Sequence, residues 1–450
     1  MTPTARRDLL NRILVCVCLA LLAFLCLYKY LYDFTTALTV SADVCLFALA
    51  GARFIPVWTR AWSTRPQKER AKRACPARCC AAAFLCVLAF HACLCAANYI
   101  YQLNINGFDG TFLESLCKLA DASDSKHYLD IAENFYVNEG STDRIVRLVF
   151  LPFYPLLIKC VSYITRDYTL AAVVVSVLCS CTAGTCVFRL AAREYGQKAG
   201  FRALRYFCLL PGAFFYFTAL TESVFVLESL LLACFLQDRK YLPACVCGCL
   251  AAFTRTVGII LIVPVMFQMI SDIINSDRKA RRALVCACEL LVIPLGFFAY
   301  LCVNKYVSGS WFKFLEYESE HWHQHVGWFF DTVRYQTQYA ASYLQSGSVH
   351  EAFGLWIANI AAQLGALAVM AAGIKRVRPA FGAYFIAYFA VAMGVSWLLS
   401  APRYLLTCFP VLLALTRMTR RKSVDVSLSL LLAAASCAYF YAYLNGWMVY

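Results

Sequence analysis

Apolar runs of about 20 residues recur from one end of this chain to the other. Each run is long enough to cross a hydrocarbon core of about 30 Å as a helix. Charged residues make up 15% of the 450 residues, whereas a soluble domain has roughly 25%. The runs lack the short alternating segments that are typical of membrane barrels. The sequence therefore predicts an all-α, polytopic helical membrane protein.

We expect about 11 to 13 spanning helices. The segment 40–58 is a weak candidate because Asp43 and Arg53 lie within it. The segment 147–164 is apolar but carries two prolines and Lys159, so we interpret it as a re-entrant or interfacial helix. The other candidates are 13–32, 79–100, 169–188, 203–220, 221–236, 241–254, 256–274, 283–303, 350–374, 380–399, 403–417 and 424–444.

The net charge of +15 comes largely from short basic clusters between these runs. If the amino terminus lies inside and the chain changes side at each span, every cluster falls inside, as cytoplasmic loops do. Nucleic-acid binding would need a soluble basic face, which this sequence lacks, so we expect no nucleic-acid partner. The clusters lie at 60–78, 189–205, 278–282, 375–378 and 417–422.

The same alternation leaves two large outside loops, at 101–168 and 304–349. No linker rich in Gly, Pro or Ser interrupts the chain, so we expect a single membrane domain over 1–450. Its other parts are N-terminal hairpins at 1–100, a helical bundle at 169–303 and C-terminal helices at 350–450.

Four ionisable residues would lie on the outer side: Asp124, Glu222, Arg255 and Arg403. Charges at the edge of apolar segments are costly unless they are paired or face a wet cavity, which makes these residues functional candidates. A guanidinium binds phosphate through two parallel hydrogen bonds, so both arginines are candidate phosphate ligands. Snorkelling arginines and a solvated turn at Glu222 are the alternatives.

Asp124 stands near the start of a polar stretch in which Tyr128, Ile131 and Ala132 repeat at helical spacing. We expect a short helix seated on the membrane surface, with Asp124 at its start. A carboxylate in that place can accept a proton from a sugar hydroxyl as a general base. An ordinary helix cap, formed by Ser123 or Asp124, fits the same position.

Three glutamates precede three alternating histidines in the segment 316–325. His321, His323 and His325 would share a face only on a strand, and this stretch is more typical of a helix or loop, so we expect no metal site. Trp322 can stack on a sugar or belong to an interfacial aromatic belt, and the belt is the favoured interpretation. The Cys75–Cys80 cluster lacks a matching histidine pair, which argues against zinc.

Taken in order, these elements resemble the PIG-V family of membrane mannosyltransferases, which includes bacterial relatives of GPI mannosyltransferase 2. Family members carry a loop similar to Trp-Asp-x-x-(His/Trp)-Tyr-x-x-Ile-Ala-Glu, which residues 123–133 resemble with Ser123 in place of Trp. A Phe-Phe-Pro-x-Tyr-Pro element is similar to 150–155, where Leu151 replaces a Phe. Further similar segments are 221–223, 254–258 with Thr256 in place of Pro, 308–314, 321–322 and 400–404. The resemblance covers residues 115–415, and the hairpins before residue 100 have no counterpart in it.

The resemblance implies a GT-C glycosyltransferase that transfers a sugar, mannose in this family, from a polyprenyl-phosphate donor to a lipid or glycan acceptor with inversion. It implies Asp124 as the catalytic base and no cofactor. The substrate-binding residues that it implies are His127, Tyr128, Glu222, Arg255, Arg403, His321 and Trp322, with Arg403 and Arg255 on the donor phosphate.

A transporter or flippase of lipid-linked sugars is the alternative function. Transporters place ionisable residues near the midplane, at broken helices in two matching halves. Here the charges gather at one interface, so we favour the enzyme. Neither outside loop contains an Asn-x-Ser/Thr sequon and the chain ends without a retention signal. These features favour a bacterial cytoplasmic membrane with an outward-facing site over an endoplasmic reticulum membrane with a lumenal one.

Overall fold

The computed structural model describes residues 75–121, 123–136, 146–325 and 327–450. The candidate spans at 13–32 and 40–58, and most of the basic cluster at 60–78, lie outside these residues. Within the described ranges the chain folds into helices joined by loops, which confirms the all-α prediction.

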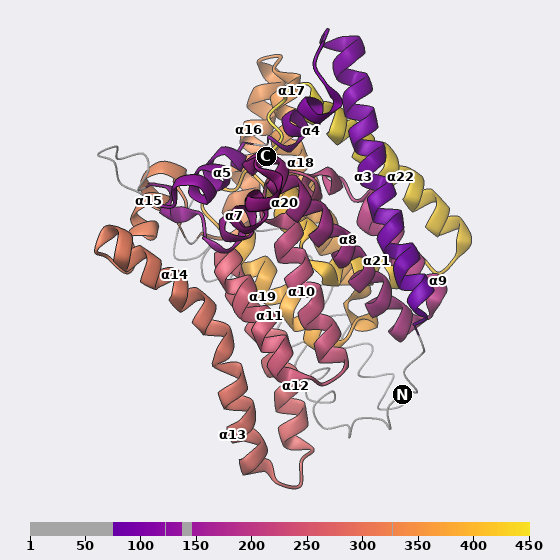
Figure 1. Cartoon of the computed structure of the whole chain (residues 1–450). Helices are drawn as coiled ribbons and strands as arrows, with labels where there is room; N and C mark the ends of the chain where they lie inside the picture. Colours follow the sequence, from indigo (N-terminus) through magenta and orange to yellow (C-terminus); the bar gives the residue numbers. More distant parts are fainter. Residues whose placement is uncertain (1–74, 122, 137–145, 326) are drawn as a thin grey trace.

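The helices follow one another along the whole described chain (Figure 1). In the first part they are α3 (Ala77–Ile105), α4 (Phe112–Ala120), α5 (Ser125–Asn134), η1 (Arg147–Val149), α7 (Phe153–Thr165), α8 (Tyr168–Tyr195), α9 (Gln197–Leu209), η2 (Ala213–Tyr216), α10 (Glu222–Gln237) and α11 (Tyr241–Thr254). They continue with η3 (Thr256–Leu261), α12 (Ile262–Ile274), α13 (Lys279–Leu290), α14 (Val292–Ser308), α15 (Lys313–Trp322), α16 (Phe329–Gln345) and α17 (Val349–Glu351). The last are η4 (Ala352–Ile357), α18 (Ala358–Gly373), η5 (Ile374–Arg376), α19 (Pro379–Ala392), α20 (Ala401–Leu406), α21 (Phe409–Met418) and α22 (Lys422–Leu444).

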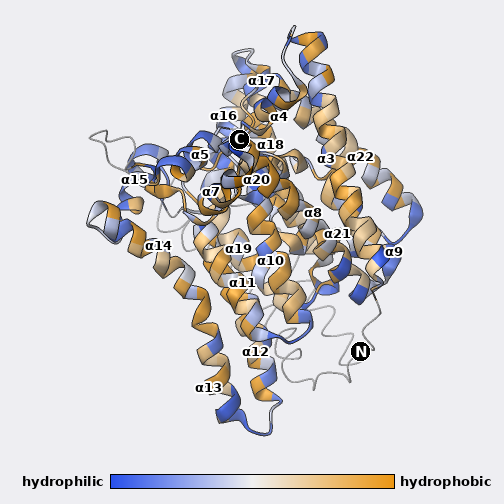
Figure 2. Cartoon of the chain, in the orientation of Figure 1, coloured by the Kyte–Doolittle hydropathy of each residue, from blue (hydrophilic) through white to orange (hydrophobic). Residues whose placement is uncertain are grey.

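Six helical stretches in the described chain are long and apolar enough to cross a membrane. Figure 2 shows apolar residues along the middle of the bundle and hydrophilic residues gathered at its two ends. The chain is therefore a multi-pass helical membrane protein. The six stretches are Ala77–Ile105, Tyr168–Tyr195, Thr256–Ile274, Lys279–Ser308, Val349–Arg376 and Lys422–Leu444, and shorter apolar helices are α7, α11, α19 and α21.

The α8 helix forms the centre of the bundle and packs against α3, α7, α9 and α10. Small residues allow this close packing: a Cβ on Gly184 would lie 2.5 Å from the Val87 side chain of α3. The α10 helix packs in turn on α11 and α20, and α20 packs on α18. These contacts hold the first residues of α10 and the body of α20 against each other, which places the site described below.

Two predicted spans are broken in the structure. The span predicted at 203–220 is wrong, because α9 ends at Leu209 and Pro211 and Gly212 follow, with Gly212 in the left-handed region at φ 87°. The span predicted at 403–417 is interrupted between α20 and α21, where Pro410 lies in the first turn of the new helix. Both interruptions are apolar, so hydropathy alone does not reveal them. Irregular backbone at such a depth requires burial in protein or a wet cavity.

The helices of both predicted outside loops lie at one end of the bundle (Figure 1). From the first loop come α4, α5 and α7, and from the second come α15 and α16. The α7 helix has 13 residues, about 20 Å of helix, which is shorter than a hydrocarbon core. This length agrees with the interpretation of 147–164 as a helix that does not cross.

Candidate functional site

Asp124 occupies the position just before the first residue of α5. The helix buries Tyr128, Ile131 and Ala132, as their spacing predicts. The Asp124 side chain forms no capping hydrogen bond. Instead its Oδ2 accepts a hydrogen bond from Nη1 of Arg403 at 3.0 Å. The interpretation of Asp124 as an ordinary helix cap is therefore wrong, and its carboxylate, 31% exposed, is paired with an arginine.

Arg403 lies in the middle of α20. This helix begins directly after the irregular segment 393–400. The Arg403 side chain is buried, and the Phe215 ring lies 5.6 Å from the guanidinium carbon. Nε donates to Oε1 of Glu222 at 2.9 Å, while Nη1 donates to Asp124. One planar guanidinium thus bridges two carboxylates from distant parts of the chain, a geometry that the shorter fork-less side chain of lysine cannot reproduce.

Arg255 follows the last residue of α11, and its extended backbone, at φ −146° and ψ 143°, breaks the chain between α11 and η3. Nη1 donates to Oε1 of Glu222 at 2.9 Å and to the Thr221 hydroxyl at 3.4 Å. The guanidinium carbon lies 4.5 Å from the centre of the Tyr404 ring, within the range of a cation–π contact. The break between the helices therefore turns this side chain toward the same carboxylate that Arg403 contacts.

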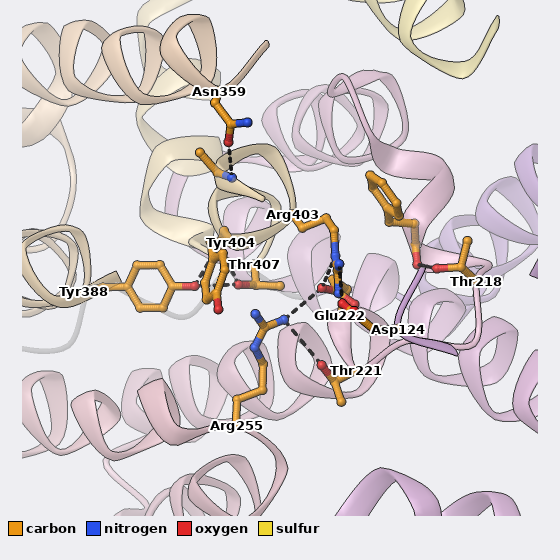
Figure 3. A network of polar contacts seen from close by, with 12 residues as sticks. Asp124, Thr218, Thr221, Glu222, Arg255, Asn359, Tyr388, Arg403, Tyr404 and Thr407 are labelled. Carbon is orange, nitrogen blue, oxygen red and sulfur yellow. Dashed lines mark hydrogen bonds and ion pairs between the residues drawn. The ribbon is translucent and has the colours of Figure 1, made fainter. Parts of the chain in front are cut away.

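Glu222 is the first residue of α10 and is completely buried. Its Oε1 accepts from both Arg255 and Arg403, as Figure 3 shows. Its Oε2 has no hydrogen-bond partner within the described part of the chain. With Asp124, the network holds two carboxylates and two guanidiniums, so their formal charges balance. Removal of one member of such a buried network leaves an uncompensated charge.

A cavity of about 350 Å³ opens beside this network. Asp124, Arg255 and Arg403 line it, whereas Glu222 lies behind the two arginines and does not. Its size falls at the lower end of the range for small-molecule sites. The other lining residues are Tyr128, Val149, Phe150, Leu151, Thr254, Thr256, Glu318, His321, Trp322, His323, Gln324, Trp397, Leu399, Ser400, Tyr404 and Tyr450.

The short helix α15 of the second predicted outside loop forms one wall of the cavity. Glu318, His321 and Trp322 line it and are spaced three and four residues apart, so they share one face of the helix. The Trp322 ring meets the Phe150 ring edge to face at 5.7 Å. The candidate residues of 321–322 therefore lie at the same cavity as Asp124, although they are far from it in sequence.

His127 and Tyr128 take different places although they are neighbours in sequence. Tyr128 lines the cavity, whereas His127 does not. The His127 ring stacks on Phe150 with centroids 4.7 Å apart, and Phe150 itself lines the cavity. Burial lowers the pKa of the His127 imidazole from its ordinary value. His127 thus supports a wall of the cavity from behind instead of facing a substrate directly.

The three alternating histidines divide between two hollows. His321 and His323 line the cavity beside Asp124, whereas His325 lines a separate one with Trp328 and Tyr335. The left-handed backbone of His323, at φ 53°, ends α15 and turns the chain from the first cavity toward the second. The imidazoles therefore do not converge on one point.

Tyr404, Trp397 and Glu318 also line the cavity and were not among the sequence candidates. Tyr404 could have been identified from the sequence, because it follows Arg403 at a break between apolar segments. Glu318 was noticed only as part of an acidic run, in which nothing distinguished it from Glu316 and Glu320. Only the fold shows that Glu318 lies on the face of α15 that lines the cavity, whereas Glu316 and Glu320 do not.

Comparisons with known proteins give weak likenesses only. No protein-family model matches the chain, and no curated protein matches it. ArnT from Cupriavidus metallidurans, in a crystal structure bound to undecaprenyl phosphate, superposes with a TM-score of 0.46 at 16% identity, over 72% of this chain and 62% of ArnT. The arabinosyltransferase EmbB from Mycobacterium smegmatis gives a TM-score of 0.35 at 13% identity, over 91% of this chain and 34% of EmbB. This chain thus spans less than two thirds of either protein's length. Because both TM-scores are below 0.5, we base the function on this chain's own cavity.

Proposed function

We propose that this protein is a membrane glycosyltransferase of the GT-C type. It would transfer a sugar, mannose by its resemblance to the PIG-V family, from a polyprenyl-phosphate donor to a hydroxyl of a lipid or glycan acceptor, with inversion. One observation carries the proposal: a carboxylate, Asp124, and two guanidiniums, Arg255 and Arg403, line one cavity at the polar end of an apolar bundle. A base and an anion site are the groups that this reaction needs.

The reaction needs one base and no separate acid. Asp124 accepts the proton of the acceptor hydroxyl while the oxygen of that hydroxyl attacks the anomeric carbon of the sugar. The bond from that carbon to the phosphate oxygen breaks on the opposite face, which inverts the centre. The leaving polyprenyl phosphate is already a stable anion, and Arg403 and Arg255 stabilise the charge that develops on it.

The two oxygens of Asp124 suit this division of roles. Oδ2 accepts from Arg403, whereas Oδ1 has no hydrogen-bond partner among the described residues. Oδ1 is thus free for an acceptor hydroxyl. Because the same guanidinium would touch the base and the donor phosphate, it would hold the nucleophile and the leaving group close to one sugar.

We place the cavity on the outer side of the membrane, in keeping with the distribution of basic loops. The lack of sequons in the outside loops favours a bacterial cytoplasmic membrane. The donor's polyprenyl chain would remain in the bilayer and its sugar would enter the cavity. The rival function, a transporter or flippase of lipid-linked sugars, shares the membrane setting but needs a passage between the two faces.

Purified full-length protein in detergent distinguishes the two functions. We expect it to move label from radiolabelled polyprenyl-phosphate mannose to a component of a membrane lipid extract. If it transfers no label, but vesicles that contain it move the labelled lipid across the bilayer, the flippase replaces the enzyme. Transfer only from polyprenyl phosphates that carry another sugar would keep the reaction class and correct the donor.

A further inference from the structure

Glu318 lines the cavity, and its carboxyl group has no partner among the residues that the structure describes. Glu318 lines the cavity from α15 on the same face as His321 and Trp322. Among the residues that the structure describes, no hydrogen bond or ion pair reaches this carboxyl group. The catalytic scheme above does not use it, so its place at the cavity calls for a separate explanation.

Neither of the neighbouring glutamates of α15 lines the cavity. Glu316 is exposed and forms an ion pair with Lys313. Glu320 is exposed and does not line the cavity. Burial raises the pKa of Glu318 to about 7, because water is lost around its charged form. Glu318 is therefore placed to be neutral over part of the range near neutral pH.

The charges around the cavity are balanced before any donor binds. Asp124 and Glu222 bear two negative charges and Arg255 and Arg403 two positive ones. A phosphodiester donor, bound as the proposed function requires, brings one further negative charge. An ionised Glu318 would add another in a poorly hydrated space, where like charges repel strongly. A neutral Glu318 avoids this repulsion and also offers an O–H donor.

Other titratable groups face Glu318 or the same cavity. The Tyr300 hydroxyl of α14 lies near Glu318 and donates to the Leu148 carbonyl. Arg147 belongs to η1, which packs on α15, and its side chain is paired with Asp130. The remaining groups in or beside the cavity are Asp124, Arg255, Arg403, His321, His323, Tyr404 and, on the same helix, Tyr317. The arginines keep their charge over the accessible pH range.

We propose, on the basis of the function proposed above, that Glu318 is a further donor-binding residue that must be protonated when the anionic donor occupies the cavity. Its O–H donates to an oxygen of the sugar phosphate. Donor binding is therefore accompanied by proton uptake at Glu318. Affinity is full while the free protein carries this proton and falls as the proton is lost.

The test measures the affinity of the full-length protein for polyprenyl-phosphate mannose, a phosphodiester whose own charge is constant in this range. Wild type, Glu318→Gln and the exposed control Glu320→Gln are compared between about pH 6 and about pH 8.5. We expect wild type and Glu320→Gln to lose up to about 30-fold in affinity over that range, the limit for a group that titrates near pH 7. Glu318→Gln, a permanently neutral isostere, should retain the affinity of wild type at low pH throughout.

The comparison with glutamine isolates Glu318, because any contribution of His321 and His323 appears equally in all three proteins. An equal decline in Glu318→Gln and wild type would overturn the role of Glu318 and leave the proposed function intact. A failure of wild type to bind the donor at any pH would overturn the proposed function, and the role of Glu318 with it.

Discussion

Arg403 and Glu222 form a buried ion pair between α20 and α10, with Nε 2.9 Å from Oε1. The pair joins residues 181 positions apart. The pair holds α20, which carries Arg403, against α10. The first residue of α10, Glu222, also binds Arg255. The alignment of both arginines with the cavity therefore depends on Glu222, which does not itself reach the cavity.

Replacement of Glu222 with Gln should destabilise the protein. The variant leaves two buried guanidiniums opposite a single carboxylate, and removal of one partner of a buried pair costs about 3–5 kcal/mol. We expect a clear fall in the thermal unfolding midpoint in detergent. Glu194→Gln, which breaks a half-exposed pair with Arg378, should cost no more than about 1 kcal/mol. Equal midpoints for the two variants would contradict the central role of Glu222.

Replacement of Arg403 with Lys should impair catalysis more than folding. Lysine keeps the positive charge but cannot contact Glu222, Asp124 and a phosphate through one planar fork. We expect kcat/KM for the donor to fall about 100- to 1000-fold, the usual loss for one positioned electrostatic group. Steady-state kinetics with the labelled donor measures this. A loss of less than about threefold would mean that Arg403 serves only as a structural ion pair.

A methyl group on Gly258 should disturb Arg255. Gly258 follows Arg255 by one turn, and an added Cβ would lie 2.1 Å from the carbonyl oxygen of Ala251 in α11. The clash could be relieved only by a shift of η3 and of the break between α11 and η3, which orients the Arg255 side chain. Gly258→Ala should therefore lose stability and transfer activity together. Gly365→Ala in α18, where nothing lies within 4 Å of the added Cβ, should be neutral or stabilise by up to about 1 kcal/mol. Full activity and stability of Gly258→Ala would contradict the packing.

His127 should make the fold sensitive to acid. Burial lowers the pKa of its imidazole in the folded state, so below about pH 6.5 the unfolded chain binds a proton that the folded chain resists. Stability contributed by the neutral ring is present at higher pH and declines as pH falls below that value. His127→Phe, which can keep the stacking on Phe150, should flatten this part of the profile of unfolding midpoint against pH. An unchanged profile would assign the acid sensitivity to other groups.

Some parts of the site were predictable from the sequence because their signals are local. The spacing of Tyr128, Ile131 and Ala132 predicted α5 and its buried face, which the structure confirms. Charges at the edges of apolar runs identified Asp124, Arg255 and Arg403, and these three line one cavity. Such charges are costly in a membrane, so their presence alone is informative.

Other parts depend on contacts between distant residues. The end of α9 at Leu209 and the interruption between α20 and α21 lie in apolar sequence, where a hydropathy window cannot detect them. The resemblance implied that His127 and Tyr128 both bind substrate, but adjacent residues on a helix point in different directions, and only Tyr128 reaches the cavity. Glu318 became distinct from the other acids only when the packing of α15 showed which face is covered.

The most direct test of the account is sugar transfer by Asp124→Asn compared with Asp109→Asn. Asp109 is an exposed carboxylate of the same predicted loop and does not line the cavity. We expect Asp109→Asn to transfer label from polyprenyl-phosphate mannose at the wild-type rate. Because the Asp124 side chain is 31% exposed, whereas Glu222 is fully buried, water can replace part of the lost charge. Asp124→Asn should therefore stay folded, with a smaller fall in thermal midpoint than Glu222→Gln, and lose at least about 100-fold in rate, the lower range for loss of a general base. Wild-type transfer by a folded Asp124→Asn protein would contradict the assignment of Asp124 as the base.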